Sequence, residues 1–267
     1  DDFDLDRLFG EEGCAILHLS GLIAALSPET TRCCVAVARK AKEYGTRISF
    51  DLNYRASFWE GREEELRRDF CEIAALADIL IGNEEDFQLC LGFKGPEAGG
   101  KDLGGKIESF KAMIGEVMQK YPNAKVIIAH VGRAYIPSDV GDAFEVLKHT
   151  KNIYFDFSAN TSDFAMQKMI EAIGVDRIMF GTDLPFTKMR MYRIEENGTY
   201  VNVVPRGLYG GIEGDVHMKE SDESEITTFV YEELRALKRA CERLGLTKED
   251  VNKLMYENAS KYFDIQL

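Results

Sequence analysis

Short apolar runs alternate with segments of helical periodicity, and this alternation restricts the fold more than any other feature of the chain. Two parallel strands need a crossover between them, and a helix after each run supplies one. Most positions within each run are apolar, which is typical of strands covered on both faces. The sequence therefore predicts an α/β fold of about six mainly parallel strands with flanking helices. The runs span 15–20, 47–52, 78–82, 125–130, 152–158 and 177–182.

The segments between the runs carry helix end signals. Ser27 is a candidate N-cap for a helix over 28–44, and Gly45 follows as its stop. Later in the chain the pattern weakens into a Gly-rich and aromatic stretch over 189–214, where only 200–204 is predicted as a short strand. Further helices are predicted over 63–76, 106–120, 162–173, 223–244 and 248–262.

The chain is acidic, with 33 Lys and Arg residues against 46 Asp and Glu residues and a formal net charge of −13. Proteins that bind duplex nucleic acid or an anionic membrane usually carry a basic excess. No stretch approaches the roughly 18 uninterrupted apolar residues of a membrane span. We therefore expect no nucleic-acid partner and no membrane partner, and we expect a small-molecule substrate.

The six cysteines form no C-x-x-C motif, and most of them lie inside apolar segments. A chain of 267 residues can bury a sizeable core without disulfide bonds. The cysteines are therefore predicted to be free thiols of a reducing compartment, which favours a cytoplasmic location.

Polar residues stand where the apolar runs end. The carboxyl ends of parallel strands are where α/β proteins place their ligands, so these side chains are candidates for a site. The alternative is that each polar group only caps the helix that follows it. The candidates for substrate contact are Asn53, Arg55, Asn83, Arg133 and Asn160, while Asp156 and Ser158 also end a run.

His130 and Asp183 are the strongest candidates for chemistry. His130 ends the run at 125–130, and an imidazole suits both metal ligation and proton transfer near neutral pH. Asp183 ends the last run, where a carboxylate could ligate a divalent ion or take a proton from bound water. Both residues are therefore predicted as catalytic residues and as metal ligands. Two ligands alone rarely hold a catalytic metal.

The first part of the chain contains LHLSG at 17–21, SFDLNYR at 49–55 and DILIGNEEDF at 78–87. These motifs resemble the middle of a PfkB (ribokinase-like) sugar kinase of the 2-keto-3-deoxygluconate kinase branch. The resemblance implies a three-layer fold, Mg-ATP as a cofactor, and a sugar-acid carboxylate bound by Arg55. It also places Asn83 in an N-x-x-E motif for magnesium and phosphate handling, with Asp86 in place of Glu.

The second part contains IIAHVGRAY at 127–135, IYFDFSANT at 153–161 and DRIMFGTDLPF at 176–186. These motifs resemble the C-terminal half of a metal-dependent amidohydrolase-related protein, a class with a (β/α)8 barrel. The resemblance implies hydrolase or lyase activity with a divalent metal, zinc or similar. It assigns His130 and Asp183 to the catalytic or metal site.

The two resemblances together predict a chimera of residues 1–126 and residues 127–267, with a seam inside the run at 125–130. Each part lacks motifs of its family, including the ATP-site section of the kinase and the His-x-His of the hydrolase. Three hypotheses follow: a hydrolase or lyase with an incomplete site, a sugar-acid kinase, and a non-catalytic fusion of two enzyme fragments. An incomplete barrel would expose an edge strand, so a homodimer is plausible, with 189–209 as a candidate interface.

Overall fold

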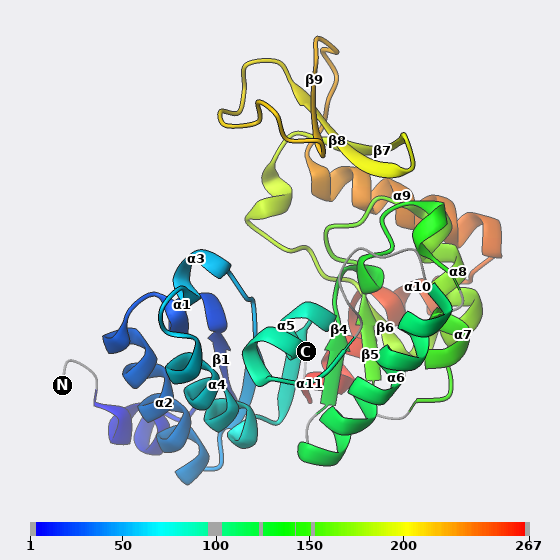
Figure 1. The fold of residues 1–267 in the computed structure, drawn as a ribbon. Coiled ribbons are helices and arrows are strands. Elements are labelled where there is room, and N and C mark those ends of the chain that lie inside the picture. Colours follow the sequence, from blue (N-terminus) through cyan, green and yellow to red (C-terminus); the bar gives the residue numbers. More distant parts are fainter. Residues whose placement is uncertain (1–3, 96–102, 123–124, 142, 151–152, 265–267) are drawn as a thin grey trace. The chain divides into compact units, whose positions relative to one another are not determined.

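The computed structural model describes residues 4–95, 103–122, 125–141, 143–150 and 153–264. The chain forms two compact units, Asp1–Ile127 and Ile128–Leu267 (Figure 1). Among the described helices, none is long and apolar enough to cross a membrane. All six cysteines are free thiols.

The first unit contains a parallel sheet. Strand β1 (Ile16–Ser20) pairs with β2 (Arg47–Asp51), and β2 pairs with β3 (Ile79–Gly82), all in parallel. Phe50 of β2 stands opposite Leu19 of β1 and Leu80 of β3. The side chains of Phe50 and Leu80 are fully buried, so the middle of this sheet is covered on its faces as the apolar runs predict.

Helices cover the sheet of the first unit. Ser27 accepts a hydrogen bond from the backbone N–H of Thr30 and closes a capping box, as its position in the sequence predicts. Trp59 and Phe50 both pack on Phe70, with ring centroids 4.9 and 5.2 Å apart, and form an aromatic core. The helices are α1 (Gly21–Ala25), α2 (Pro28–Glu43), α3 (Ala56–Trp59), α4 (Glu63–Leu76), α5 (Glu84–Leu91) and α6 (Leu103–Lys120), and a π-helical turn covers Arg7–Glu12.

The second unit continues the alternation of strands and helices. Strand β4 (Lys125–Ile128) lies at the boundary of the units, and β5 (Ile153–Asp156) pairs in parallel with β6 (Ile178–Met179). Helices α8 and α9 pack against each other (Figure 1). The helices are α7 (Ala143–Leu147), α8 (Asp163–Ile173), α9 (Phe229–Leu244), α10 (Lys248–Asn252) and α11 (Asn258–Phe263), with a π-helical turn over Lys253–Glu257 between the last two.

The stretch predicted as mostly irregular forms a small sheet. Strand β7 (Tyr192–Glu196) pairs antiparallel with β8 (Thr199–Pro205), and β9 (Met218–Ser221) pairs in parallel with β8. Val204 and Phe229 are buried in a common cluster, which ties this sheet to the start of α9. Helix α9 begins at Phe229 rather than at 223, because residues 227 and 228 pair with the chain before β7.

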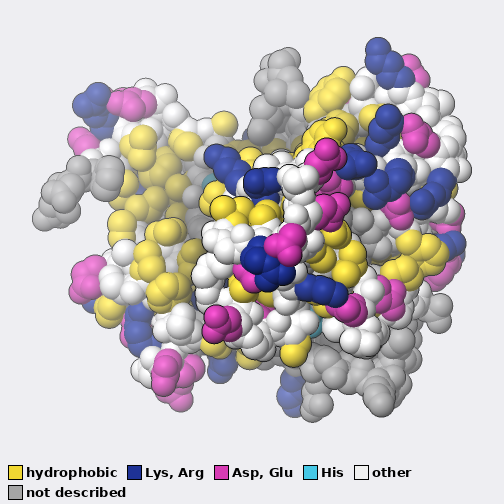
Figure 2. Space-filling view, turned by 90° about the horizontal axis from the view of Figure 1, so that it is seen from above, with side chains coloured by type: hydrophobic (Ala, Val, Ile, Leu, Met, Phe, Trp, Pro, Cys, Tyr) yellow, Lys and Arg dark blue, Asp and Glu magenta, His cyan; other side chains and the backbone are white. Residues whose placement is uncertain are grey.

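The prediction of an α/β chain with six parallel strands and flanking helices is confirmed, while the small sheet was not foreseen beyond 200–204. Strand β1 also departs from the prediction, since His18 at its centre is exposed. Acidic and basic side chains are interspersed on the face shown in Figure 2.

Candidate active site

A hydrogen-bond chain joins Asp156, Ser158 and His130 at the strand ends of the second unit. The Ser158 hydroxyl donates to Oδ1 of Asp156 at 2.6 Å, and Oγ of Ser158 lies 2.9 Å from Nδ1 of the His130 ring. The same Oδ1 accepts the backbone N–H groups of His130 at 2.9 Å and of Ser158 at 3.0 Å. A carboxylate with three donors is held firmly in place, so Asp156 fixes both partners.

The surroundings of Nδ1 select one tautomer of His130. Nδ1 also lies 3.0 Å from the carbonyl oxygen of Ser158, which is only an acceptor. Since the Ser158 hydroxyl hydrogen is directed to Asp156, Nδ1 must carry the hydrogen that both Ser158 oxygens accept. The lone pair of the neutral ring is then on Nε2, which is the nitrogen for a ligand or for proton transfer.

Backbone of positive φ surrounds this chain of hydrogen bonds. His130, Val131, Gly132 and Arg133 form a left-handed turn after β4, with φ values of 58°, 56°, 60° and 62°. Non-glycine residues rarely adopt this conformation, and each costs about 1–2 kcal/mol there. Such a costly backbone persists where surrounding contacts fix it, and it is frequent at functional sites. The turn orients the His130 ring toward Ser158.

Asn160 stabilises the left-handed turn through hydrogen bonds to its backbone. Its Nδ2 donates to the carbonyl oxygens of Ala134 at 2.8 Å and His130 at 3.3 Å, while its Oδ1 accepts the backbone N–H of Ser162 at 2.8 Å. The side chain is fully buried. These contacts give Asn160 a structural role, and its predicted contact with substrate stays a prediction. Arg133, at the end of the turn, is half-buried.

Glu233 is a site residue that the sequence analysis missed. It lies on α9, is fully buried, and neither carboxyl oxygen makes a hydrogen bond of good geometry. Burial, with the negative charges of Asp156 and Asp183, raises the pKa of Glu233 to about 9, so the group is neutral at pH 7. The sequence did offer one signal for it. Glu233 stands four residues after Phe229, on the face of α9 that is buried, where a charged residue is unusual.

Asp183 lies where the sequence predicts it, after β6, in an exposed position with a φ of 51°. The described residues contain no group of three or more His, Cys, Asp or Glu side chains placed to hold a metal ion. Three hydrogen bonds already occupy Oδ1 of Asp156. A catalytic zinc ion needs three protein ligands, and the described side chains alone do not complete such a set. The metal-ligand roles of His130 and Asp183 stay predictions.

The first unit uses the predicted Asn83 and Asp86 as a helix cap. Oδ1 of Asn83 accepts the backbone N–H groups of Glu85 at 2.9 Å and Asp86 at 3.0 Å, at the start of α5. The Asp86 oxygens accept the backbone N–H of Asn83 and that of Tyr54, both at 2.9 Å. Asp86 is buried, and burial raises its pKa. Asn83 therefore caps the helix that follows it, which is the alternative role expected for polar residues at strand ends.

Arg55 and Asn53 lie beyond β2, beside this cap. Arg55 is exposed, and its guanidinium donates to the carbonyl oxygen of Tyr54 at 2.9 Å. Asn53 is half-buried with a φ of 37°. Because Tyr54 is hydrogen-bonded to Asp86, the structure brings the ends of β2 and β3 together.

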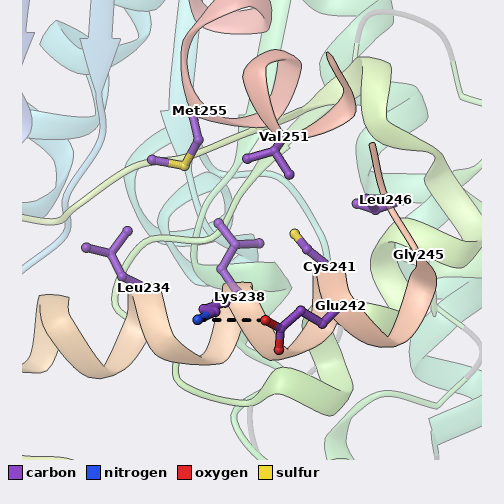
Figure 3. Close-up of a pocket in the computed structure, with 9 residues that line it drawn as sticks. Leu234, Lys238, Cys241, Glu242, Gly245, Leu246, Val251 and Met255 are labelled. Atoms are coloured by element: carbon purple, nitrogen blue, oxygen red, sulfur yellow. Dashed lines mark ion pairs between the residues drawn. The ribbon is translucent and has the colours of Figure 1, made fainter. Parts of the chain in front are cut away.

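A separate apolar pocket of about 520 Å³ lies between α9 and the helices that follow it (Figure 3). Leu234 and Cys241 line it from α9, and Val251 and Met255 line it from the opposite side. Burial raises the pKa of the Cys241 thiol, which makes it a poor nucleophile. The pocket therefore offers mainly apolar surface, with the Lys238–Glu242 ion pair among its lining residues.

Curated relatives of the chain are sugar-acid kinases. It is 30% identical to 5-dehydro-2-deoxygluconokinase of Shouchella clausii over 149 residues, which is 55% of this chain and 41% of the relative. It is 33% identical to 2-dehydro-3-deoxygalactonokinase of Haloferax volcanii over 85 residues, which is 32% of this chain and 26% of the relative. The chain thus spans less than half the length of these relatives.

Solved structures of both kinds are similar to the chain. The 2-dehydro-3-deoxygluconokinase of Thermotoga maritima is 32% identical and covers 47% of this chain and 35% of its own, with a TM-score of 0.38. An amidohydrolase of Burkholderia multivorans is 11% identical and covers 98% of this chain and 88% of its own, with a TM-score of 0.47.

Two family descriptions match the sequence itself. One is the pfkB family of carbohydrate kinases, matched by residues 12–146, and the other is Amidohydrolase, matched by residues 111–265. The two matches overlap over 111–146, so the exact seam between 126 and 127 stays a prediction. Each match covers half of the chain or more, and the chain therefore belongs to both the pfkB carbohydrate kinase family and the amidohydrolase family.

Proposed function

We propose that the second unit catalyses a hydrolase or lyase reaction on a small molecule, with His130 as the general base. The hydrogen-bond chain from Asp156 through Ser158 to Nδ1 of His130 carries this proposal. It is an arrangement that holds an imidazole in one tautomer and leaves Nε2 to take a proton.

The proton transfer follows from the hydrogen bonds. Nε2 accepts a proton from water or from an acidic group of the substrate, and the ring becomes an imidazolium ion. Nδ1–H remains bonded to Ser158, and the negative charge of Asp156 stabilises the new positive charge through the Ser158 hydroxyl. A base held in this way contributes roughly 10²–10⁴-fold to a rate.

A divalent metal would add Lewis-acid activation of water or substrate. Zinc is bound in one solved amidohydrolase of Burkholderia multivorans, which has 10% sequence identity and a TM-score of 0.46. The described side chains include no group of three placed to hold a metal ion. The proton transfer to His130 therefore involves only side chains of this chain.

The test is turnover of a substrate panel by the full chain, with p-nitrophenyl esters and p-nitroanilides for hydrolysis and hydroxybenzoates for release of CO2. His130→Gln is expected to lower kcat/KM by about 10²–10⁴-fold, and Ser158→Ala by about 10-fold or more. His149→Gln is the matched control, because His149 is exposed.

Equal turnover by wild type and His130→Gln would contradict the proposal, as would no turnover with any member of the panel. The latter result favours the non-catalytic fusion. Metal content is measured for wild type and Asp183→Ala in the same experiment. A loss of bound metal in Asp183→Ala would support the metal-ligand role predicted for that residue.

We also propose that the first unit binds a keto-sugar acid through Arg55, as a pfkB-type carbohydrate kinase would. Its support is the exposed guanidinium at the end of β2, together with the relatives named as kinases of such acids. Titration calorimetry with 2-keto-3-deoxygluconate is the test, and Arg55→Gln is expected to weaken binding about 10-fold or more. Arg68→Gln, at an exposed Arg paired with Asp69, is the control. Absence of binding heat from wild type would remove this proposal.

A further inference from the structure

A polar cavity of about 330 Å³ lies in the second unit, between the small sheet and α9. Its lining residues include Thr161, Arg193 of β7, Glu223, Glu225 and Arg235. Neither His130 nor Asp183 is among its lining residues, so it is distinct from the site proposed above. Its volume is at the lower end of the range for small-molecule sites.

Arg193 is the cation of this cavity without an acidic partner. Its Nε donates to Oδ1 of Asn202 at 2.9 Å, and one terminal nitrogen donates to the carbonyl oxygen of Ala159 at 3.1 Å. The rings of Tyr135 and Tyr200 lie 4.1 and 4.9 Å from the guanidinium carbon. Within the described part of the chain, no carboxylate forms an ion pair with Arg193.

The aromatic contacts fix the guanidinium without using its hydrogen-bond donors. A guanidinium has five N–H donors, and the two hydrogen bonds above use only part of them. The remaining donors include the terminal fork that binds a carboxylate in a bidentate manner. Burial is the largest influence on the pKa of Arg193 and lowers it, which an anion would offset.

The other charged groups of the cavity are either paired or exposed. Arg235 pairs with Glu232 at 3.3 Å, and Arg239 donates to Asp163 at 2.6 Å. Glu223 and Glu225 are exposed, and Glu223 accepts a hydrogen bond from the hydroxyl of Tyr192 at 2.8 Å. The cavity lining therefore combines one guanidinium that has no ion pair with any described residue and two exposed carboxylates.

We propose that this cavity binds a small zwitterion, whose carboxylate docks on the Arg193 fork and whose ammonium group lies between Glu223 and Glu225. A neutral ligand would leave the Arg193 charge without a partner. A dianion would bring its second carboxylate toward Glu223 and Glu225, where like charges repel. The buried Oγ1 of Thr161, another lining residue, has no hydrogen-bond partner among the described residues and is an additional polar group for the ligand.

The test is titration calorimetry of the full chain with three probes of similar size: 4-aminobutyrate, butyrate and succinate. We expect 4-aminobutyrate to bind about 10-fold tighter than butyrate, because only the zwitterion reaches both charged regions. Succinate is expected to bind most weakly. The measurement reports binding rather than turnover, so it is independent of the activity proposed for His130.

Two variants assign the contacts. Arg193→Lys keeps the charge and loses the fork, so it is expected to weaken both 4-aminobutyrate and butyrate about 10-fold. The Glu223→Gln, Glu225→Gln double variant is expected to weaken only 4-aminobutyrate, and it decides the test if Arg193→Lys fails to fold by circular dichroism. Arg206→Lys is the control, since Arg206 is exposed and already pairs with Asp222.

The proposal is overturned if wild type binds none of the probes, or if succinate binds most tightly. It is also overturned if the double variant folds and leaves the preference for 4-aminobutyrate over butyrate unchanged.

Discussion

Glu233 places a carboxyl group in a fully buried position near Asp156 and Asp183. Its pKa rises from an ordinary 4.5 to about 9, chiefly through burial. Between these values the folded protein holds a proton that the unfolded chain releases. The contribution of this group to stability is therefore fully present below pH 4.5, and it is lost as pH rises toward 9.

Replacing Glu233 with Gln removes the titrating group while keeping its shape. We expect the Glu233→Gln protein to be more stable than wild type at pH 8 by on the order of a few kcal/mol, and the difference to shrink at pH 5. Urea unfolding at several pH values between 5 and 9 measures this. Glu242→Gln, at an exposed position of the same helix, is the control and should show no such trend. A Glu233→Gln protein whose stability relative to wild type does not change with pH would show that the carboxyl is ionised in the folded state.

The positions of the polar side chains at the strand ends could be predicted from the sequence, but the hydrogen bonds between them could not. His130, Asp156 and Ser158 all stand at the ends of predicted strands, so their neighbourhood follows from the topology. Their hydrogen bonds depend on the left-handed turn at 130–133, for which only Gly132 offers a local signal. Arg193 lies on a strand that was not predicted, so no pattern pointed to its cavity.

At the scale of elements, Asn83 caps the start of α5 and is expected to contribute to the stability of the fold. Asn83→Ala removes the acceptor for two backbone N–H groups and is expected to cost about 1 kcal/mol of stability. Asn83→Ser keeps a capping oxygen and should stay within a few tenths of a kcal/mol of wild type. Urea unfolding measures both. If Asn83→Ala is as stable as wild type, the cap contributes nothing to stability.

Helices with a capping residue or a strongly charged face were predicted well, and elements held by tertiary contacts were not. The predicted bounds of 63–76 match α4, and Ser27 caps α2 as expected. Strands β7 and β9 have mixed burial and few apolar residues, so they give no alternating pattern. They form because β8, which carries a buried apolar centre, pairs with both.

The whole molecule consists of two compact units, and the single Trp allows one of them to be followed alone. Trp59 is buried in the first unit, and Phe155 is fully buried in the second. Phe155→Ala is expected to destabilise the second unit by about 3–5 kcal/mol. In urea, part of the circular dichroism transition should then move to lower concentration, while the Trp59 fluorescence transition stays in place.

The reciprocal control is Phe70→Ala, which removes a ring that packs on Trp59 at 4.9 Å and should shift the fluorescence transition. If Phe155→Ala moves the Trp59 transition as far as the circular dichroism transition, the two units unfold as one cooperative body.

The tautomer of His130 tests the central claim most directly. Histidine labelled with ¹⁵N gives separate NMR signals for Nδ1 and Nε2, and the His130→Gln spectrum assigns the signals of His130 among the four histidines. The hydrogen-bond chain from Asp156 through Ser158 predicts that the neutral form of the ring carries its hydrogen on Nδ1 and none on Nε2, and that this preference is lost in Ser158→Ala. A ring that carries its hydrogen on Nε2 at neutral pH would contradict the assignment of His130 as the general base.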